Sequence, residues 1–294
     1  MVVHGVTLFT LKIMRKFNII GAPFSHAHTS TWWKKSNILE WDYGGTSNDT
    51  SFYVDYGLNE IDSQKRDGEK YGWILESNSM LNGLIGNIKK NPNQYLDKLK
   101  CIFTCDEELL SMDERFKWSP GYGVSVERYG GGDKIKLISM VTSNKQMTEQ
   151  QRFRVDFVNK NRSNIDLYGR GYKPIDNKNI GLDNYMFSVA IENAIYDTYF
   201  TEKVLDCFAT KTIPLYMGSR GINKFFNEEG IIFLEDINYD ITNITEKDYN
   251  DRLEYVDDNF NRVKEFDILD DWIYKTYIED EQNTEKDTLD MVRE

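Results

Sequence analysis

Short apolar runs alternate with polar loops and amphipathic segments along most of the chain. In the first half the apolar runs lie at residues 17–22, 52–54, 71–75 and 101–104. Runs of this length between polar loops predict buried strands. The segments with helical spacing lie at residues 80–90, 93–100 and 106–110, with Pro92 as the break between the first two. This alternation is typical of a parallel sheet covered by helices on both faces.

A second round of the same alternation begins after three consecutive glycines. The segment 129–133 (Y-G-G-G-D) favours neither helix nor strand, so it is the best candidate for a linker. Beyond it, strands are predicted at residues 136–141, 165–168, 185–191, 212–216 and 230–234, and helices at residues 148–159 and 201–209. From residue 238 onward the pattern is helical and acidic. We therefore expect an α/β protein of two similar units with a cleft between them.

The length also favours two domains, because 294 residues exceed the size at which a single core usually keeps growing. The expected divisions are an N-terminal tail (1–16), a first α/β domain (17–130), a second α/β domain (131–268) and a C-terminal helix and tail (269–294). The first residues have neither a basic leader nor a clear cleavage site, so we interpret them as a tail. The D-W-I-Y segment at 271–274 is expected to be a helix that packs across the domains.

The composition argues against several classes of protein. The net charge of −12 disfavours binding to nucleic acid, and no apolar run approaches the roughly 20 residues that cross a membrane. Three cysteines are too few for a disulfide framework, and Cys101 and Cys105 have no matching pair that would complete a zinc site. These features predict a cytoplasmic protein, and a homodimer stays open.

The most informative chemistry lies at the start of the predicted helix 201–209. Thr201 can cap this helix, whose first turn presents unpaired backbone N–H groups and a partial positive charge. Lys203 adds a full positive charge, and Glu202 supplies a carboxylate for nearby hydroxyl groups. Together these groups suit a ligand that carries both a diphosphate and a polyol.

Polar loops follow four predicted strands of the second half, at residues 143–144, 169–171, 192–193 and 218–219. The carboxyl ends of parallel strands gather at one edge of a sheet, where open α/β sheets bind ligands. Each loop also has a structural interpretation, since Gly169 can serve only a tight turn and Thr201 can serve only as a cap. Taken jointly, the four loops indicate a binding site at this edge.

Five motifs of the second half occur in a specific order and spacing. They are S-M-V-T-S-N (139–144), Arg152 placed fourteen residues before the Asp of I-D-L-Y-G-R-G (165–171), I-E-N (191–193), Y-F-T-E-K (199–203) and T-I-P-L-Y-M-G-S (212–219). On these residues the run 136–236 resembles the C-terminal domain of glycosyltransferase family 10, the α-1,3/4-fucosyltransferases. Over the first 130 residues the resemblance is weaker, and its clearest elements are W-I-L-E-S (73–77) and F-T-C-D-E-E-L-L (103–110).

The resemblance implies the GT-B fold, in which two Rossmann-like domains face each other across a cleft. It also implies a GDP-sugar donor, most often GDP-fucose, and no required cofactor or bound catalytic metal ion. The implied donor-binding residues are Arg152, Asn193, Tyr199, Glu202, Lys203, Gly169 and Thr201. Of these, Arg152 would meet the diphosphate or ribose, Lys203 the β-phosphate and Glu202 the sugar hydroxyls. Arg154 is the alternative to Arg152, and the chain departs from the family pattern at Ala194, where Ser is usual.

An inverting transferase also needs a base to accept the proton of the attacking hydroxyl. We expect Glu76 to be this base, because it ends an apolar strand of the first domain and matches the family's base by position. Asp106 and Glu107 are the alternatives.

The loop after the first strand supplies candidate acceptor contacts, namely Ser25, His26 and Trp32. His26 and His28 have a spacing that metal ligands can use, but no third ligand with suitable spacing is visible, so we predict no metal site.

The sequence therefore predicts an inverting, α-1,3-fucosyltransferase-like enzyme that moves L-fucose, or a similar 6-deoxyhexose, from its GDP form to a glycan hydroxyl. Two alternatives stay open. One is the same fold with another donor, such as a GDP-linked amino-deoxyhexose, and the other is a glycan-binding relative that has lost turnover. The presence of Glu76, Glu202 and Lys203 counts against the second alternative.

Overall fold

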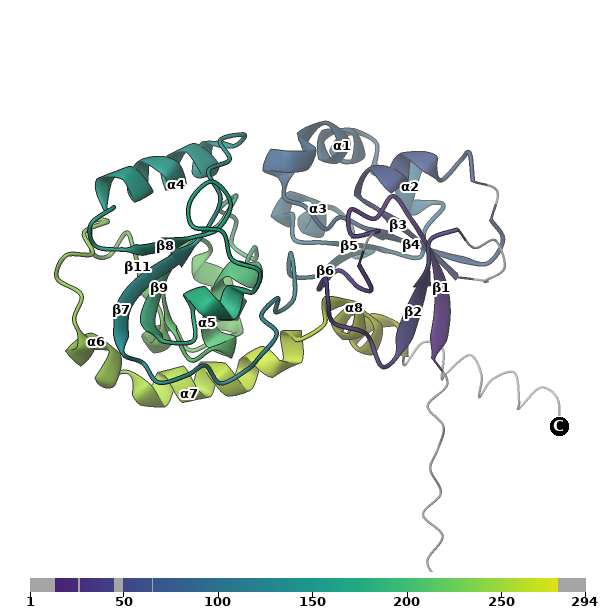
Figure 1. Ribbon diagram of the computed structural model, residues 1–294. Helices are drawn as coiled ribbons and strands as arrows, with labels where there is room; N and C mark the ends of the chain where they lie inside the picture. Colours follow the sequence, from purple (N-terminus) through teal and green to yellow (C-terminus); the bar gives the residue numbers. More distant parts are fainter. Residues whose placement is uncertain (1–13, 26, 45–49, 65, 280–294) are drawn as a thin grey trace, which may run out of the picture.

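The protein consists of two parallel sheets, each surrounded by helices in its own lobe (Figure 1). The computed structural model describes residues 14–25, 27–44, 50–64 and 66–279. Within these residues every strand pair is parallel. The predicted α/β class and the two successive units are therefore confirmed.

The first lobe contains a six-stranded sheet in the order β2-β1-β3-β4-β5-β6. Its strands are β1 (Arg15–Ile20), β2 (Leu39–Asp42), β3 (Thr50–Val54), β4 (Glu69–Trp73), β5 (Ile102–Thr104) and β6 (Phe116–Trp118). Its helical elements are η1 (Asp55–Glu60), α1 (Asn78–Lys90), α2 (Pro92–Leu96) and α3 (Glu107–Met112). The break between α1 and α2 falls at Asn91, directly before Pro92, because proline fits the first turn of a helix but not its interior.

The second lobe contains a five-stranded sheet in the order β11-β10-β9-β7-β8. Its strands are β7 (Lys136–Val141), β8 (Asp166–Tyr168), β9 (Tyr185–Ile191), β10 (Ile213–Met217) and β11 (Ile232–Phe233). Its helical elements are α4 (Glu149–Lys160), η2 (Lys178–Gly181), α5 (Glu202–Ala209), η3 (Arg220–Lys224) and η4 (Glu228–Gly230). All five strands coincide with predicted apolar runs.

Both sheets reverse their strand order at a single point. In the first sheet the reversal lies between β1 and β3, and in the second it lies between β7 and β9. Loops on the two sides of such a point diverge and leave a crevice at the carboxyl edge of the sheet. Each lobe therefore has one edge position at which a ligand is favoured.

The segment 129–133 joins the lobes without regular structure, but it is not a loose tether. Gly131 has φ +66°, and a Cβ on it would lie 2.2 Å from the carbonyl oxygen of Thr210. The amide of Gly130 donates to the carbonyl of Ala209 at 2.8 Å. The glycines thus allow the chain to pass close to the end of α5.

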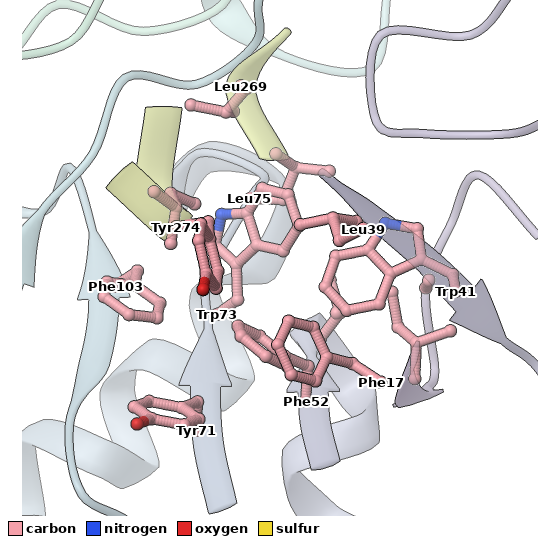
Figure 2. Close-up of a cluster of buried hydrophobic side chains, with 14 of the residues drawn as sticks. Phe17, Leu39, Trp41, Phe52, Tyr71, Trp73, Leu75, Phe103, Leu269 and Tyr274 are labelled. Carbon is pink, nitrogen blue, oxygen red and sulfur yellow. The ribbon is translucent and has the colours of Figure 1, made fainter. Parts of the chain in front are cut away.

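The last described segment of the chain returns to the first lobe. After α6 (Glu246–Asn250), α7 (Leu253–Arg262) and η5 (Val263–Phe266), it forms α8 (Leu269–Ile273) and a π-helical turn at Tyr274–Ile278. We refer to residues 267–278 as the C-terminal strap. Figure 2 shows Tyr274 of the strap beside Trp73 and Phe103, and these side chains belong with Leu269 to one buried cluster.

The strap also bridges the lobes, as expected for the D-W-I-Y segment. The ring of Trp272 lies 5.3 Å from that of Trp118 in β6 and 6.0 Å from that of Phe266. Among the residues described, no helix is both long and apolar enough to span a membrane.

Asp270 fastens the strap to the first lobe. Its carboxylate is 2% exposed and accepts hydrogen bonds from the amide and hydroxyl of Ser30 and from Nε1 of Trp41. We expect Asp270→Ala to lower the free energy of unfolding by about 3 kcal/mol, because it leaves buried donors without an acceptor. Urea unfolding of the full chain measures this change. Asp257→Ala is the control: its exposed pair with Lys211 contributes at most about 1 kcal/mol, and an equal effect of the two variants would contradict the prediction.

Candidate active site

A cavity of about 310 Å³ lies at the crevice of the second sheet. It is lined by the end of β7 and the loop after it (140–143 and Lys145), by β9 (188–191) and Asn193, and by the first turns of α5. This is the position at which the reversed strand order favours a ligand. The predicted binding edge of the second unit therefore contains a real cavity.

The cavity is rich in positive charge although the chain as a whole is acidic. Four cationic side chains line it, namely Lys145, Arg154, Lys178 and Lys203. Two carboxylates, Glu202 and Asp206, line it as well, and a third, Glu192, lies buried behind Lys203. The remaining positive charge suits an anionic ligand.

The start of α5 is held by a buried carboxylate. Glu192 is completely buried and accepts hydrogen bonds from the amide and hydroxyl of Thr201, at 2.9 and 2.7 Å. Thr201 caps α5 by accepting from the amide of Lys203 at 3.4 Å. Thr201 is therefore buried and does not line the cavity itself. Its role in this structure is to fix the first turn of the helix.

Lys203 projects from that first turn into the cavity. Its ammonium lies 3.3 Å from Glu192, 3.0 Å from the Thr201 hydroxyl and 3.6 Å from Glu202. These partners hold the charge at the amino end of α5, where the helix dipole also favours an anion.

Glu202 stays ionised in spite of its burial. Burial alone would raise the pKa of this carboxyl, but Lys203 and Lys178 lower it to about 2. Lys178 in turn donates to Asp206 at 2.8 Å. Burial would lower the pKa of the Lys178 ammonium, but the carboxylates of Asp206 and Glu202 raise it. Glu202 is thus a permanent acceptor for hydroxyl groups in the cavity.

Of the two arginines of α4, the structure places the alternative one in the cavity. Arg152 is exposed, and its guanidinium donates to the carbonyls of Gln146 and Met147 at the start of the helix. Arg154 is buried and donates to the carbonyl of Ile191 at 3.1 Å and to Oδ1 of Asn193 at 3.4 Å. Arg154 therefore lines the cavity and Arg152 does not, because the two side chains leave the helix on different faces, and a donor contact of either arginine stays a prediction.

The buried guanidinium of Arg154 also has unused hydrogen-bonding capacity. Its Nε atom is buried and has no hydrogen-bond partner among the residues that the structure describes. Burial lowers the pKa of Arg154, and the carboxylates of Glu192 and Glu202 oppose this shift. An anionic ligand in the cavity would satisfy this partly desolvated cation.

The remaining donor-side candidates have different positions. Asn193 lines the cavity. Tyr199 is 1% exposed and packs against Cys105 and Ala194 outside the cavity lining. Gly169 has φ +111°, and a Cβ there would lie 1.9 Å from the carbonyl oxygen of Thr142. Gly169 therefore serves the backbone of the loop beside β7.

Glu76 lies in the first lobe, close to where the loop after β4 contacts the second lobe. It follows the end of β4, and its Oε1 accepts a hydrogen bond from the hydroxyl of Tyr122 at 2.8 Å. Burial raises the pKa of Tyr122 well above its usual value, and the charges of Glu76 and Glu202 raise it further. Ser79, three residues beyond Glu76, donates to the carbonyl of Asn193 at 3.2 Å. These contacts place the loop after β4 against Asn193, a residue of the cavity lining, and the role of Glu76 as the base stays a prediction.

The two alternative bases are engaged in structural contacts. Asp106 caps α3 by accepting from the amide of Leu109 and pairs with Lys89 at 2.9 Å. Glu107 accepts from the amide of Asp197 in the second lobe. Glu76 is thus the best placed of the three carboxylates.

Of the three predicted acceptor contacts, one lines a cavity, one does not, and one lies outside the described residues. Trp32 lines a second cavity, which adjoins the first. Ser25 is exposed and lies outside both cavities, and His26 lies outside the described residues. In the part of the chain that the structure describes, no three His, Cys, Asp or Glu side chains gather as metal ligands would.

Asp55 lies next to the backbone of Glu76, and its burial predicts that the stability of the protein depends on pH. Its carboxylate accepts from the amides of Leu75 and Glu76, at 2.8 and 3.3 Å. Burial raises the pKa of Asp55 from 3.8 to about 7, against the effect of these two hydrogen bonds. Between these values the folded protein binds more protons than the unfolded chain, so this group's contribution to stability falls as the pH rises.

We therefore expect the free energy of unfolding to fall with pH more steeply in the wild-type protein than in Asp55→Asn. Between pH 5 and pH 7 the difference in slope is on the order of 1 kcal/mol per pH unit. Asn keeps an oxygen acceptor for the two amides but does not titrate. Urea unfolding of both proteins at several pH values measures the slopes, and parallel curves would refute the buried, proton-binding Asp55.

Comparison with known proteins gives the family. The profile described as the C-terminal region of glycosyltransferase family 10 (fucosyltransferase) matches residues 132–288, more than half of the chain. The chain belongs to glycosyltransferase family 10. This is a family of transferase enzymes, and the match includes α5, Arg154 and the whole second sheet.

One curated relative is the α-(1,3)-fucosyltransferase FucT of Helicobacter pylori, which is 38% identical over 71 residues. That match covers 24% of this chain but only 15% of the relative's length.

Two solved structures share the arrangement of the lobes. An α1,3-fucosyltransferase crystallised with GDP has a TM-score of 0.51 and 17% sequence identity, with 90% of this chain and 92% of that chain covered. TarM has a TM-score of 0.50 and 12% identity, with 77% of this chain and 53% of that chain covered. Both likenesses concern the fold, which is of the GT-B type, as the sequence predicts.

Three residues of the site escaped sequence reasoning. Lys178, Asp206 and Tyr122 have no local motif that marks them. Asp206 carries the only available signal, since it lies four residues after Glu202 and therefore on the same face of α5. Lys178 and Tyr122 reach the site only through tertiary packing.

Proposed function

We propose that this protein transfers L-fucose, or a similar 6-deoxyhexose, from a GDP-sugar to a hydroxyl group of a glycan. The family and the α-(1,3)-fucosyltransferase named among its relatives support this reaction. The observation that carries the proposal is the convergence of Lys203 and Arg154 at the amino end of α5, with Glu76 across the junction of the lobes.

The transfer proceeds as a single displacement that inverts the anomeric carbon. Glu76 accepts the proton of the acceptor hydroxyl while the oxygen attacks the sugar. The bond to the β-phosphate breaks, and GDP leaves with the bonding electrons. Lys203, Arg154 and the first turn of α5 stabilise the charge that develops on the departing diphosphate. Glu202 orients the donor sugar through its hydroxyl groups.

A thermal-shift screen against GDP, UDP, ADP and CMP tests the donor. A ligand that binds only the folded protein raises its melting temperature by mass action. We expect GDP to give the largest shift. Equal shifts with all four nucleotides, or a shift with UDP alone, would refute a GDP-sugar as the donor.

The proposed mechanism needs no metal ion, because Lys203 and Arg154 supply the positive charge beside the diphosphate. We therefore expect more than half of the transfer activity to remain in excess EDTA. The measurement is GDP release from GDP-fucose in the presence of an acceptor, with and without the chelator. Complete loss of activity that added Mg²⁺ or Mn²⁺ restores would contradict this part of the proposal.

A further inference from the structure

A second cavity, of about 200 Å³, adjoins the first at the junction of the lobes. The two cavities share Lys178 and Glu202 in their linings. The rest of the lining comes from three parts of the chain. The first lobe supplies Trp32 and Trp33, the segment between β6 and β7 supplies Ser125 and Glu127, and the second lobe supplies Asp176 and Asn177. Pockets for drug-sized ligands begin at about 300 Å³, so this space suits a single ring.

Two indoles form the first-lobe wall. Trp32 is 41% exposed and Trp33 is 68% exposed, so part of each side chain is accessible to a ligand. Trp32 adopts φ +60°, a conformation that is unfavourable for a large side chain. Backbone outliers of this kind persist where the surrounding structure holds them, and they are concentrated at functional sites.

The C-terminal strap holds this turn in place. Ser30 donates to Asp270, Ser36 donates to Asp271, and the hydroxyl of Thr31 accepts from the amide of Leu269 at 3.3 Å. The loop that carries the two indoles is therefore already ordered by these hydrogen bonds. This lowers the entropic cost of binding a ligand there.

The rest of the lining carries several carboxylates. Glu127 and Asp176 are exposed, and in the described part of the chain neither forms a salt bridge. Among the described residues of the lining, the cation is Lys178, which is already paired with Asp206 at 2.8 Å and with Glu202 at 3.6 Å. Carboxylates accept hydrogen bonds from hydroxyl groups but repel other carboxylates at this range.

We propose that this second cavity is the acceptor subsite and that it takes one uncharged hexose ring of the glycan. The ring lies against Trp32 and Trp33, its hydroxyls donate to Glu127 and Asp176, and a uronic or sialic acid is rejected at this position. The shared Glu202 places the ring beside the donor sugar. The inference deepens the proposed function and rests on it, because an acceptor subsite presupposes glycosyl transfer.

The test measures glycan binding by the full chain in the presence of GDP. The probes are immobilised neutral disaccharides and the same disaccharides with a uronic acid in place of one hexose. We expect at least tenfold weaker binding of the uronic acid forms, and at least tenfold weaker binding of the neutral forms by Trp33→Ala. Ile135→Ala, which removes a 74% exposed side chain outside both cavities, is the control and should bind as the wild type does.

A second variant tests the charge directly. Glu127→Gln together with Asp176→Asn keeps oxygen acceptors but removes the repulsion, so it should bind the uronic acid forms about tenfold more tightly than the wild type. Equal binding of both probe types by the wild type, an unchanged Trp33→Ala variant, or no binding of any neutral disaccharide would overturn the subsite. A GDP-induced thermal shift in the same samples separates the two proposals. Its absence would count against the GDP-sugar donor and not against the acceptor subsite.

Discussion

Lys203→Ala should reduce transfer by two or more orders of magnitude. In the ground state this ammonium already has acceptors in Glu192, Thr201 and Glu202. Its main effect is therefore expected in the transition state, when the leaving diphosphate gains charge beside it. Removal of one such stabilising group typically lowers kcat by about 10²–10³. Steady-state GDP release with a saturating acceptor measures the loss.

The variant needs two controls. The first concerns folding, because Glu192 is completely buried and would lose its cationic partner. Adding Glu192→Gln removes that unpaired carboxylate, so the double variant should fold as well as the wild type and stay equally inactive. Lys247→Ala removes an exposed lysine outside the cavities and should leave the rate unchanged. Near-normal turnover of Lys203→Ala would remove this residue from the mechanism.

Glu76→Gln should abolish most transfer while GDP binding remains. The amide has the size of the carboxylate and its oxygen can still accept the hydrogen bond from Tyr122, but it cannot take a proton. General base catalysis contributes about 10²–10⁴-fold, so we expect a loss in that range. The rate is measured as above, and calorimetric titration measures GDP binding.

Glu107→Gln is the matched control for this variant. Glu107 accepts from the amide of Asp197, and the amide side chain can keep that contact. The control should retain activity within a few fold. If Glu107→Gln is inactive and Glu76→Gln is active, the base is Glu107, after β5, and not Glu76, after β4.

The fold was largely predictable because its strands are apolar and bounded by clear loops. β9 is buried at all seven positions and β10 at all five, so each reads as a continuous apolar run. β2 and β6 were missed because L-E-W-D and F-K-W are short and contain charged residues. Only pairing at the edges of the sheet reveals them as strands.

The site was predictable where several of its groups share one turn of helix. Thr201, Glu202 and Lys203 are adjacent in sequence, and the cap fixes their geometry. The burial of Arg154 could also have been predicted from periodicity. Arg154 lies three and four residues before the buried Phe157 and Val158, which places it on the inner face of α4.

Other parts of the site depend on contacts that no local pattern encodes. Tyr122 belongs to a segment without regular structure between β6 and β7, and it meets Glu76 because this segment packs against the core of the first lobe. Lys178 reaches Glu202 from η2, a short helix between β8 and β9. Neither residue has a neighbour in sequence that indicates its role.

The most direct test of the central claim is a crystal structure of the full chain with bound GDP. We predict that the diphosphate lies at the amino end of α5, with phosphate oxygens within about 3 Å of the Lys203 ammonium and the Arg154 guanidinium. GDP bound elsewhere, with these two cations still facing an empty cavity, would contradict it.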